Sequence, residues 1–172
     1  LEQQDLAPAA LFGRGVAFNG KSSSLTVAGR PVLDLSEAMT LSAWVKPQAA
    51  NGRRTIVARL GRGGATYAVH ATTGKGGPGG VSLVARGTKR VAVPDDLPLG
   101  KWTHVALTYD GSRLRLYRNA EEVGSAAVAG SIRDANGPLR IGGRVPGGGW
   151  FKGVLDEVLA PLRATPGVDW TV

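Results

Sequence analysis

Residues 101–128 hold side-chain types that enzymes use for chemistry. The stretch reads KWTHVALTYDGSRLRLYRNAEEVGSAAV and contains His104, Tyr109, Asp110 and a run of arginines. A positioned histidine or carboxylate can transfer protons, and arginines bind anions, so this combination would fit an active site. The same letters also fit two neighbouring strands of a sandwich in which these groups only hold the sheets together. The elements that position them decide between catalysis and packing.

The pattern of this stretch is that of a β-hairpin. Strand alternation puts the even-numbered residues of 102–109 on one face with His104, and the odd-numbered residues on the core face. The pair Asp110-Gly111 predicts a tight turn into the next strand. No carboxylate or nucleophile lies two positions from His104 to orient it. We therefore interpret His104 as a packed imidazole bonded to a backbone or hydroxyl group.

The composition predicts a turn-rich globular chain. With 172 residues, of which 42% are hydrophobic and 20% charged, the chain can bury one core. The 26 Gly and 10 Pro between short apolar runs indicate many turns that join many strands. No apolar run approaches the roughly 18 residues that cross a bilayer, so we expect no membrane span. No cysteine and only 2 His exclude disulfides, thiolate metal sites and histidine-rich zinc sites.

The net charge of the chain is +8, from 21 Lys plus Arg against 13 Asp plus Glu, and such a charge attracts anionic partners. A composition rich in arginine, alanine and glycine also arises from a GC-rich genome without selection for binding, so both explanations stay open. The basic residues are scattered and are not interleaved with aromatics, which argues against nucleic acid as the partner. Because the chain begins with Leu1, we expect a processed form, a fragment or an excised module.

Apolar residues recur with a period of two along nearly the whole chain. In MTLSAWVKP, for example, Leu41, Ala43 and Val45 share one face. No window of 11 or more residues has a persuasive period of 3.6. About a dozen short antiparallel strands cannot stay as one open sheet. We therefore predict an all-β, two-sheet antiparallel jelly-roll sandwich, a single domain over residues 1–172 with its core in about residues 13–160 and short tails.

Five of these runs resemble, in their order and spacing, the laminin G-like jelly-roll domains of the concanavalin A-like lectin and glucanase superfamily. They are VAFNGKSSSLTV, MTLSAWVKP, KWTHVALTYDGSRLRLYRNAEEV, LRIGG and FKGVLDEV. The resemblance implies a module that binds carbohydrates, glycoconjugates or proteins as part of a larger secreted or cell-surface protein. Some members of the superfamily are glycoside hydrolases or lyases, so the resemblance suggests a role without settling one.

The acidic residues do not form the pair that glycoside hydrolysis needs. Retaining glycosidases hold two carboxyl groups about 5 Å apart, which one strand provides at positions i and i+2. The acidic pairs of this chain are adjacent instead, so that in a strand their members point to opposite faces: Glu121-Glu122, Asp95-Asp96 and Asp156-Glu157. The glycine-rich stretch GRGGATYAVHATTGKGG lacks the ending and the helix of a phosphate loop. We predict a non-catalytic module.

Two groups of residues are candidates for ligand binding. Tyr67 and Trp150 lie beside glycine loops, where an exposed ring can stack on a sugar or can instead cap a sheet edge. Arg113, Arg115 and Tyr117 share one strand face, which can attract a sulfated or uronic glycan or can be an ordinary solvated face. We predict carbohydrate or glycoconjugate recognition. The alternative is a protein-interaction, adhesion or structural module attached to a catalytic neighbour.

The resemblance also implies a metal. In similar jelly rolls the first and last strands run together and often share a structural calcium, held by a side-chain oxygen after the first strand and an aspartate of the last. Here Asn19 and Asp156 stand at those places, and both can supply the oxygens that calcium prefers. We expect one structural calcium with Asn19, Gly20 and Asp156 among its ligands. Asn19 can instead be a simple turn former, and Asp156 can cap backbone amides.

Overall fold

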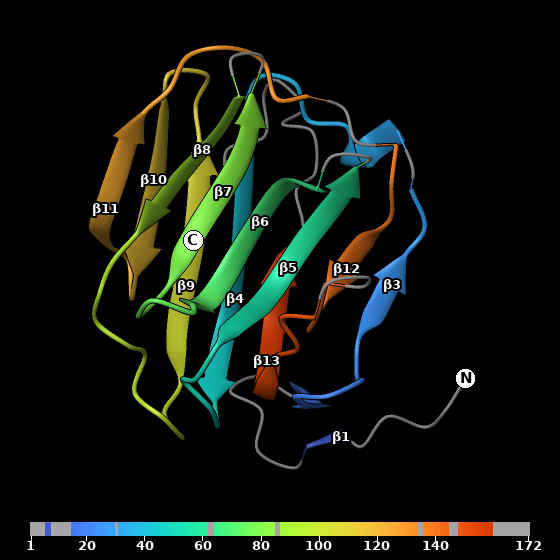
Figure 1. The fold of residues 1–172 in the computed structure, drawn as a ribbon, viewed down its shortest axis with the longest axis vertical. Coiled ribbons are helices and arrows are strands. Elements are labelled where there is room, and N and C mark those ends of the chain that lie inside the picture. Colours follow the sequence, from blue (N-terminus) through green and yellow to red (C-terminus); the bar gives the residue numbers. More distant parts are fainter. Residues whose placement is uncertain are drawn as a thin grey trace.

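The computed structural model describes residues 6–7, 15–29, 31–61, 64–84, 87–133, 136–144 and 148–159; for residues 6–7, 32 and 81–84 only the backbone is described. These residues form two antiparallel sheets packed face to face (Figure 1). They contain thirteen strands and one short 3₁₀ helix, η1 (Pro31–Leu33). The predicted all-β sandwich is therefore confirmed. That the whole chain is a single domain stays a prediction.

The first sheet has seven strands in the order β1-β2-β13-β4-β9-β10-β11. Neighbouring strands pair antiparallel throughout, and β2 lies beside β13, so segments from the two ends of the described chain are hydrogen-bonded to each other. The strands are β1 (Leu6–Ala7), β2 (Gly15–Asn19), β4 (Met39–Pro47), β9 (Thr103–Tyr109), β10 (Arg113–Arg118), β11 (Glu121–Ala127) and β13 (Lys152–Leu159).

The second sheet has six strands in the order β3-β12-β5-β6-β7-β8, and it faces the viewer in Figure 1. Its centre is the long hairpin of β5 and β6, and β8 is one of its edges. The strands are β3 (Leu25–Val27), β5 (Arg53–Gly61), β6 (Gly64–Thr73), β7 (Gly79–Val84), β8 (Gly87–Ala92) and β12 (Leu139–Ile141). None of the described residues forms a helix long and apolar enough to cross a membrane.

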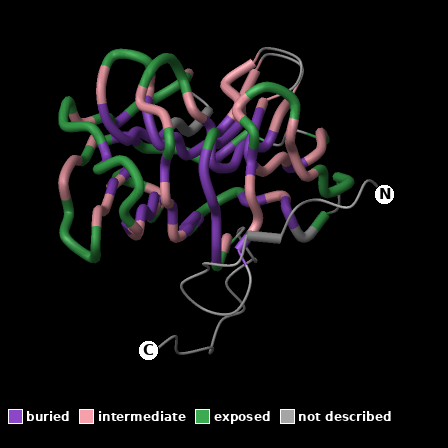
Figure 2. Tube along the Cα trace, turned by 90° about the horizontal axis from the view of Figure 1, so that it is seen from below, coloured by how far each residue is buried: buried purple, intermediate pink, exposed green. Residues whose placement is uncertain are grey.

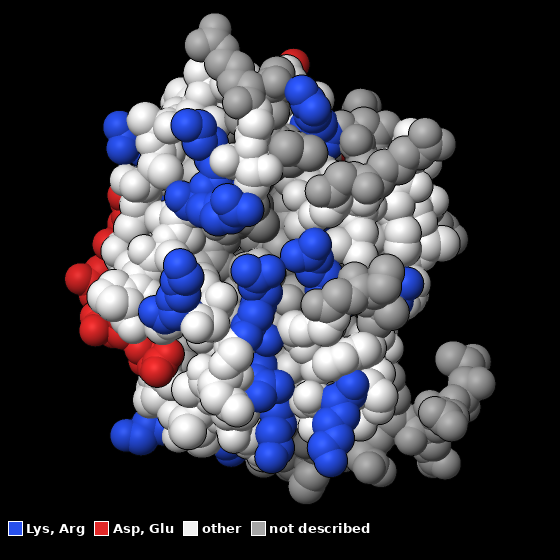
Figure 3. Space-filling view, viewed as in Figure 1, with Lys and Arg blue, Asp and Glu red and all other residues white. Residues whose placement is uncertain are grey.

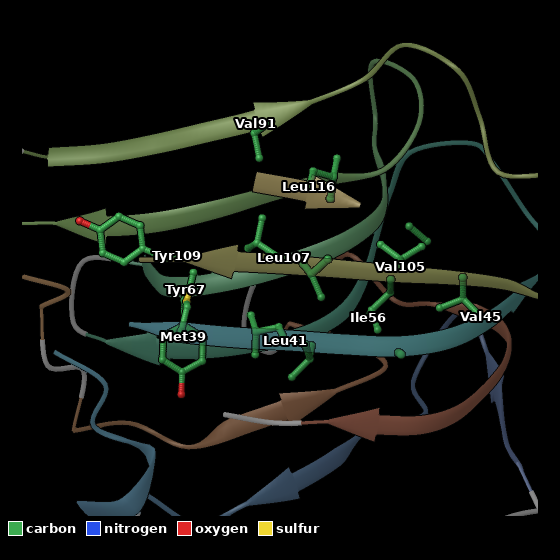
Figure 4. Packing of buried hydrophobic residues seen from close by; sticks show 14 of the residues in the cluster. Met39, Leu41, Val45, Ile56, Tyr67, Val91, Val105, Leu107, Tyr109 and Leu116 are labelled. Atoms are coloured by element: carbon green, nitrogen blue, oxygen red, sulfur yellow. The ribbon is translucent and has the colours of Figure 1, made fainter. Parts of the chain in front are cut away.

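The core lies between the two sheets, where buried positions from both layers meet (Figures 2 and 4). On β4 the alternation is clear, because Leu41, Ala43 and Val45 are fully buried. On β10 Leu114 and Leu116 are fully buried as well. The predicted inward faces of these strands are thus confirmed, and removing apolar area from water at such positions is the main force that holds the two layers together.

The hairpin of β9 and β10 explains the role of Asp110, the aspartate of residues 101–128. The Asp110 Oδ1 accepts hydrogen bonds from the backbone N–H groups of Ser112 and Arg113, at 2.9 and 2.8 Å. Gly111 has a φ of 91°, a backbone conformation that side chains disfavour. Asp110 therefore shapes the predicted turn, and it stands at the end of the sheet and not in a catalytic cluster.

Candidate ligand-binding groove

An open groove of about 650 Å³ crosses the outer face of the six-stranded sheet. We call it the basic groove and define it by its floor, His70, Gly79 and Ala92, and by four cations that line it, Arg53, Lys75, Arg90 and Arg144. The three floor residues form one row across the sheet, because β6 pairs His70 with Gly79 of β7 and β7 pairs Gly79 with Ala92 of β8. The groove therefore depends on the register of three strands.

The floor is hollow at Gly79 and Ala92 because these two residues are small. Gly79 carries no side chain, and a Cβ there would lie 2.5 Å from the Thr73 Cγ2. Its neighbour Gly80 points the other way, where a Cβ would lie 2.2 Å from the Leu107 Cδ1 in the core. These distances are shorter than atoms tolerate, so the glycine pair lets β7 pack on the core on one face and leaves the groove open on the other.

His70 is the buried polar group of the floor. It is 7% exposed, and its Nδ1 lies 3.1 Å from the Oγ1 of Thr55 on the paired strand. Burial, together with the charges of Arg53 and Arg144, lowers the pKa of His70 to about 3. The imidazole is therefore neutral near pH 7 and is a poor general base, because a base works best with a pKa near the working pH.

The cations give the groove its charge. Arg53, Lys75 and Arg90 are exposed and Arg144 is half-buried. The described lining of the groove contains no aspartate or glutamate. Figure 3 shows the same contrast for the whole face, with Lys and Arg spread over the sheet and Asp and Glu gathered along the left edge. An anionic ligand that approaches this face therefore meets a positive potential.

The loop after β12 holds Arg144 over the sheet. The Arg144 N–H donates to the carbonyl of Gly148 (3.0 Å), and the Thr55 N–H of β5 donates to the carbonyl of Gly149 (2.8 Å). Gly149 has a φ of 70°, and a Cβ there would lie 2.9 Å from the Thr55 Oγ1. The loop thus packs closely on β5, beside the threonine that contacts His70.

Tyr67, predicted to bind ligand, lies in the core instead. It is 1% exposed, and its hydroxyl donates to the carbonyl of Leu33 at 3.0 Å. Figure 4 shows its ring among the apolar side chains between the sheets. Burial raises the pKa of Tyr67 to about 12. The prediction was wrong for Tyr67, because a ring with no exposed face cannot stack on a sugar.

Trp150, the second aromatic candidate, is half-buried beside the loop that carries Arg144. A Cβ at Gly143 would lie 2.6 Å from the Trp150 Cε3, so the indole packs directly against that glycine. The Trp150 carbonyl accepts a hydrogen bond from the Nη1 of Arg54 (2.8 Å). Trp150 does not line the basic groove, and its role in binding stays a prediction.

Arg113, Arg115 and Tyr117 share the outer face of β10 as predicted, but β10 belongs to the other sheet. Arg115 forms an ion pair with Asp110 and lies 3.7 Å from a carboxylate oxygen of Glu122. The Arg115 guanidinium also lowers the pKa of Asp110. These three residues therefore lie apart from the basic groove. The charge of Arg115 is largely neutralised by its acidic neighbours.

His104 lies on the outer face of the seven-stranded sheet and packs against an aromatic ring. The ring centroids of His104 and Trp44 are 5.2 Å apart, and burial lowers the pKa of His104. Its backbone N–H donates to the side-chain oxygen of Asn119 (2.9 Å). This agrees with the packed imidazole predicted from the sequence, although its contact is a ring and its hydrogen bond comes from the backbone.

The predicted calcium ligands do not converge. β2 pairs Asn19 with Lys152, whereas Asp156 lies further along β13, about 13 Å away at about 3.3 Å per residue. The Asn19 side-chain oxygen already accepts three backbone N–H groups of the turn, those of residues 21–23, at 2.8, 2.9 and 3.1 Å. The Asp156 Oδ1 accepts the N–H of Glu157 (2.9 Å). One ion cannot contact both, so calcium stays a proposal that can use only one of these residues.

Sequence reasoning missed most of the groove. It did not connect Arg53 with His70 or with the other cations, which are Lys75, Arg90 and Arg144. These residues come from β5, β6, β8, a turn and a loop. The signal in the sequence was the glycine-rich stretch from residue 61 to residue 77, which we compared with a phosphate loop and not with the floor of a groove.

The fold and the groove together define a two-sheet β-sandwich of jelly-roll type. Residues 19–161 match a laminin G family described as the Concanavalin A-like lectin/glucanases superfamily. The match spans most of the chain, which therefore belongs to this superfamily. No curated protein sequence matches the chain.

Solved structures with the same fold include sugar-bound modules. Domain 4 of an extracellular arabinanase from Geobacillus stearothermophilus, in complex with arabinotriose, has a TM-score of 0.73 and 22% identity, covering 94% of this chain and 78% of that chain. The CBM40 of a Ruminococcus gnavus sialidase, bound to alpha2,3 sialyllactose, has a TM-score of 0.68 and 18% identity, covering 86% and 90%. Domains LG4-5 of the mouse laminin alpha1 chain have a TM-score of 0.68 and 15% identity, covering 84% and 40%.

Proposed function

We propose that this chain is a non-catalytic carbohydrate-binding module whose ligand occupies the basic groove. The groove itself carries the proposal. It is concave, its floor combines a glycine and an alanine with the buried His70, and several polar groups converge on it, which are the usual features of a ligand site. Its volume of about 650 Å³ suits a short stretch of saccharide.

The similar structures support a saccharide as the ligand. The arabinanase domain was solved with arabinotriose, and the sialidase module with sialyllactose. The fold alone is shared at these identities, so the ligand of this chain is inferred from its own groove. Because the arabinanase is extracellular, we place the module in a larger secreted or cell-surface protein.

Recognition, and not hydrolysis, is the activity that the groove supports. Glycosidases need two carboxyl groups on either side of the scissile bond. The described lining of the groove offers arginines, a lysine, a neutral histidine and small residues instead. These groups can donate hydrogen bonds and attract charge, but they cannot provide the acid and nucleophile of that reaction.

A glycan array with the parent chain and two variants tests the proposal. Ala92 is exposed on the floor of the groove, so Ala92→Trp fills the groove without entering the core. Ala127→Trp is the matched control, because Ala127 is exposed on β11 of the other sheet. We expect the parent and Ala127→Trp to bind the same glycans, and Ala92→Trp to bind at least about tenfold more weakly.

Two results would contradict the proposal. Equal binding by Ala92→Trp and the parent would place the ligand outside the groove. An array without any bound glycan would favour the protein-interaction or structural alternative. Incubating the chain with a bound glycan then tests catalysis, and we expect no new reducing ends above a sample without protein.

A further inference from the structure

We propose that the basic groove selects acidic saccharides, and that carboxylates or sulfates of the ligand bind at Arg53 and at Arg144, on either side of His70. The proposal rests on the proposed function and adds the chemical class of the ligand. It is carried by the position of the two arginines and by the partners that they lack in the described part of the chain.

The two arginines lie toward opposite ends of β6, with His70 between them. β5 pairs Arg53 with Thr73, and the Arg144 Nη2 lies 3.6 Å from the point that a Cβ of Gly64 would occupy. Arg53 begins β5, and its Cγ lies 3.7 Å from the point that a Cβ of Gly149 would occupy. The same loop carries Arg144 and is hydrogen-bonded to β5 through Thr55. Both arginines line the groove together with His70, and both charges lower the pKa of that imidazole. Acidic groups of a ligand that lies along the groove over His70 would therefore meet an arginine on either side of it.

Most of the other arginines with described contacts already have partners within the protein. Arg59 pairs with Asp34, and Arg115 pairs with Asp110. Arg54 donates to the side chain of its neighbour Asn51 and to a loop carbonyl. These three guanidinium groups are therefore engaged in holding turns and strands, and they offer little to a ligand.

Arg53 and Arg144 differ from these three arginines. Among the described residues no carboxylate pairs with either guanidinium, and the Nε of Arg144 is buried without a hydrogen-bond partner. That Nε is covered, as are the Nε atoms of Arg59 and Arg140, so an oxyanion of a ligand can reach Arg144 only through its terminal nitrogens. Guanidinium groups bind carboxylates and sulfates through two parallel hydrogen bonds, so a planar or tetrahedral oxyanion matches their geometry.

The neutral His70 keeps the groove from changing its charge with pH. Arginine stays protonated throughout the working range, and the His70 pKa of about 3 keeps the imidazole uncharged above about pH 4. The other cations that line the groove are Lys75 and Arg90. The pH dependence of binding should therefore come from the ligand: a carboxylated saccharide loses affinity when it is protonated, and a sulfated one does not.

The experiment compares two saccharides that differ only in charge. The probes are a hexamer of galacturonic acid and the same hexamer with its carboxyl groups methyl-esterified, titrated calorimetrically into the parent chain at low salt. A sulfated galactan hexasaccharide from carrageenan, which carries sulfate and no carboxylate, distinguishes sulfate from carboxylate as the anion. We expect at least one acidic probe to bind at least about tenfold more tightly than the ester, with the difference shrinking as salt screens the charges.

Arginine variants locate the anion. Arg53→Gln and Arg144→Gln each should remove most of the preference for the acidic probe. Arg113→Gln is the matched control, because Arg113 is an exposed arginine on the other sheet, and it should keep the preference. Equal affinity for the acid, the sulfated probe and the ester would overturn the proposal, and so would an equal loss in Arg113→Gln, which would show attraction by net charge alone.

The Ala92→Trp variant separates this proposal from the proposed function. Suppose that the parent binds the acid and the ester equally well and that the variant binds both more weakly. The groove then binds saccharide, and only the acidic class of the ligand is wrong. If it binds the acid as the parent does, the groove is not the binding site and the proposed function fails.

Discussion

The two outer faces of the sandwich carry similar residues in different arrangements. On the six-stranded sheet, arginines and a lysine line a hollow row of His70, Gly79 and Ala92 and meet no acidic group within the described lining. On the seven-stranded sheet, Arg115 is held by Asp110 and Glu122, and His104 packs on Trp44. Charge alone therefore does not mark a binding face. The number of cations left without an acidic neighbour, and the space beside them, distinguish the two faces.

The largest expected effect concerns the two sides of β10. Leu116 is fully buried, so Leu116→Ala should lower the free energy of unfolding by about 2 to 5 kcal/mol through lost contacts and a cavity. Arg115→Ala on the outer face should cost less than about 1 kcal/mol, because an exposed ion pair contributes little. Urea unfolding of both variants measures the difference. Similar losses would show that the outer face of this sheet carries stability that its exposure does not reveal.

An intermediate effect concerns His70 and pH. Its pKa is about 3 in the folded chain and about 6.5 when unfolded, so the unfolded state binds the proton more readily as the pH falls. Stability should therefore be full above about pH 6.5 and decline toward pH 3, by about 2 kcal/mol between pH 6.5 and 5. Chemical unfolding at several pH values measures this decline.

The matched variants for this pH effect are His70→Gln and His104→Gln. Glutamine does not titrate, so His70→Gln should flatten the decline between pH 6.5 and 5. His104 is more accessible, and burial lowers its pKa in the same direction, so His104→Gln should retain most of the decline. If His104→Gln flattened the curve and His70→Gln did not, the buried neutral histidine would be His104 on the seven-stranded sheet and not His70.

The smallest expected effect concerns calcium. Because Asn19 and Asp156 lie at different points of the paired strands, they cannot share one ion. An ion held at only one of these two residues would have few protein ligands, so we expect millimolar calcium to raise the melting temperature only slightly above that in chelator. A clear rise of the melting temperature in calcium, abolished by Asp156→Asn, would establish a metal at that aspartate, because binding to the native state alone raises its stability.

The sequence predicted the strands and the sandwich because alternation is a local signal. The prediction for Tyr67 failed because burial does not alternate along its strand. Residues 66–72 of β6 are buried on both faces of the strand. Burial there does not distinguish the core face from the outer face. Only the long-range pairing of β6 with its neighbours shows which face holds the tyrosine and which holds His70.

The groove was out of reach of sequence reasoning for a different reason. Its cations come from segments between residue 53 and residue 144, and they meet only when the register of β5 to β8 and the loop after β12 are known. Bulges in the pairing of β5 with β6 shift that register. A charge count indicates that cations exist, but it cannot tell which of them keep an acidic neighbour.

An NMR titration with the galacturonic acid hexamer tests the central claim most directly, because it reports both faces in one experiment. The account predicts that the amide shifts that change most belong to the floor and its neighbours, including His70, Gly79 and Ala92. Amides of β10 around Arg115 and Tyr117 should stay unchanged. Changes confined to β10, with the floor of the groove unaffected, would contradict the account.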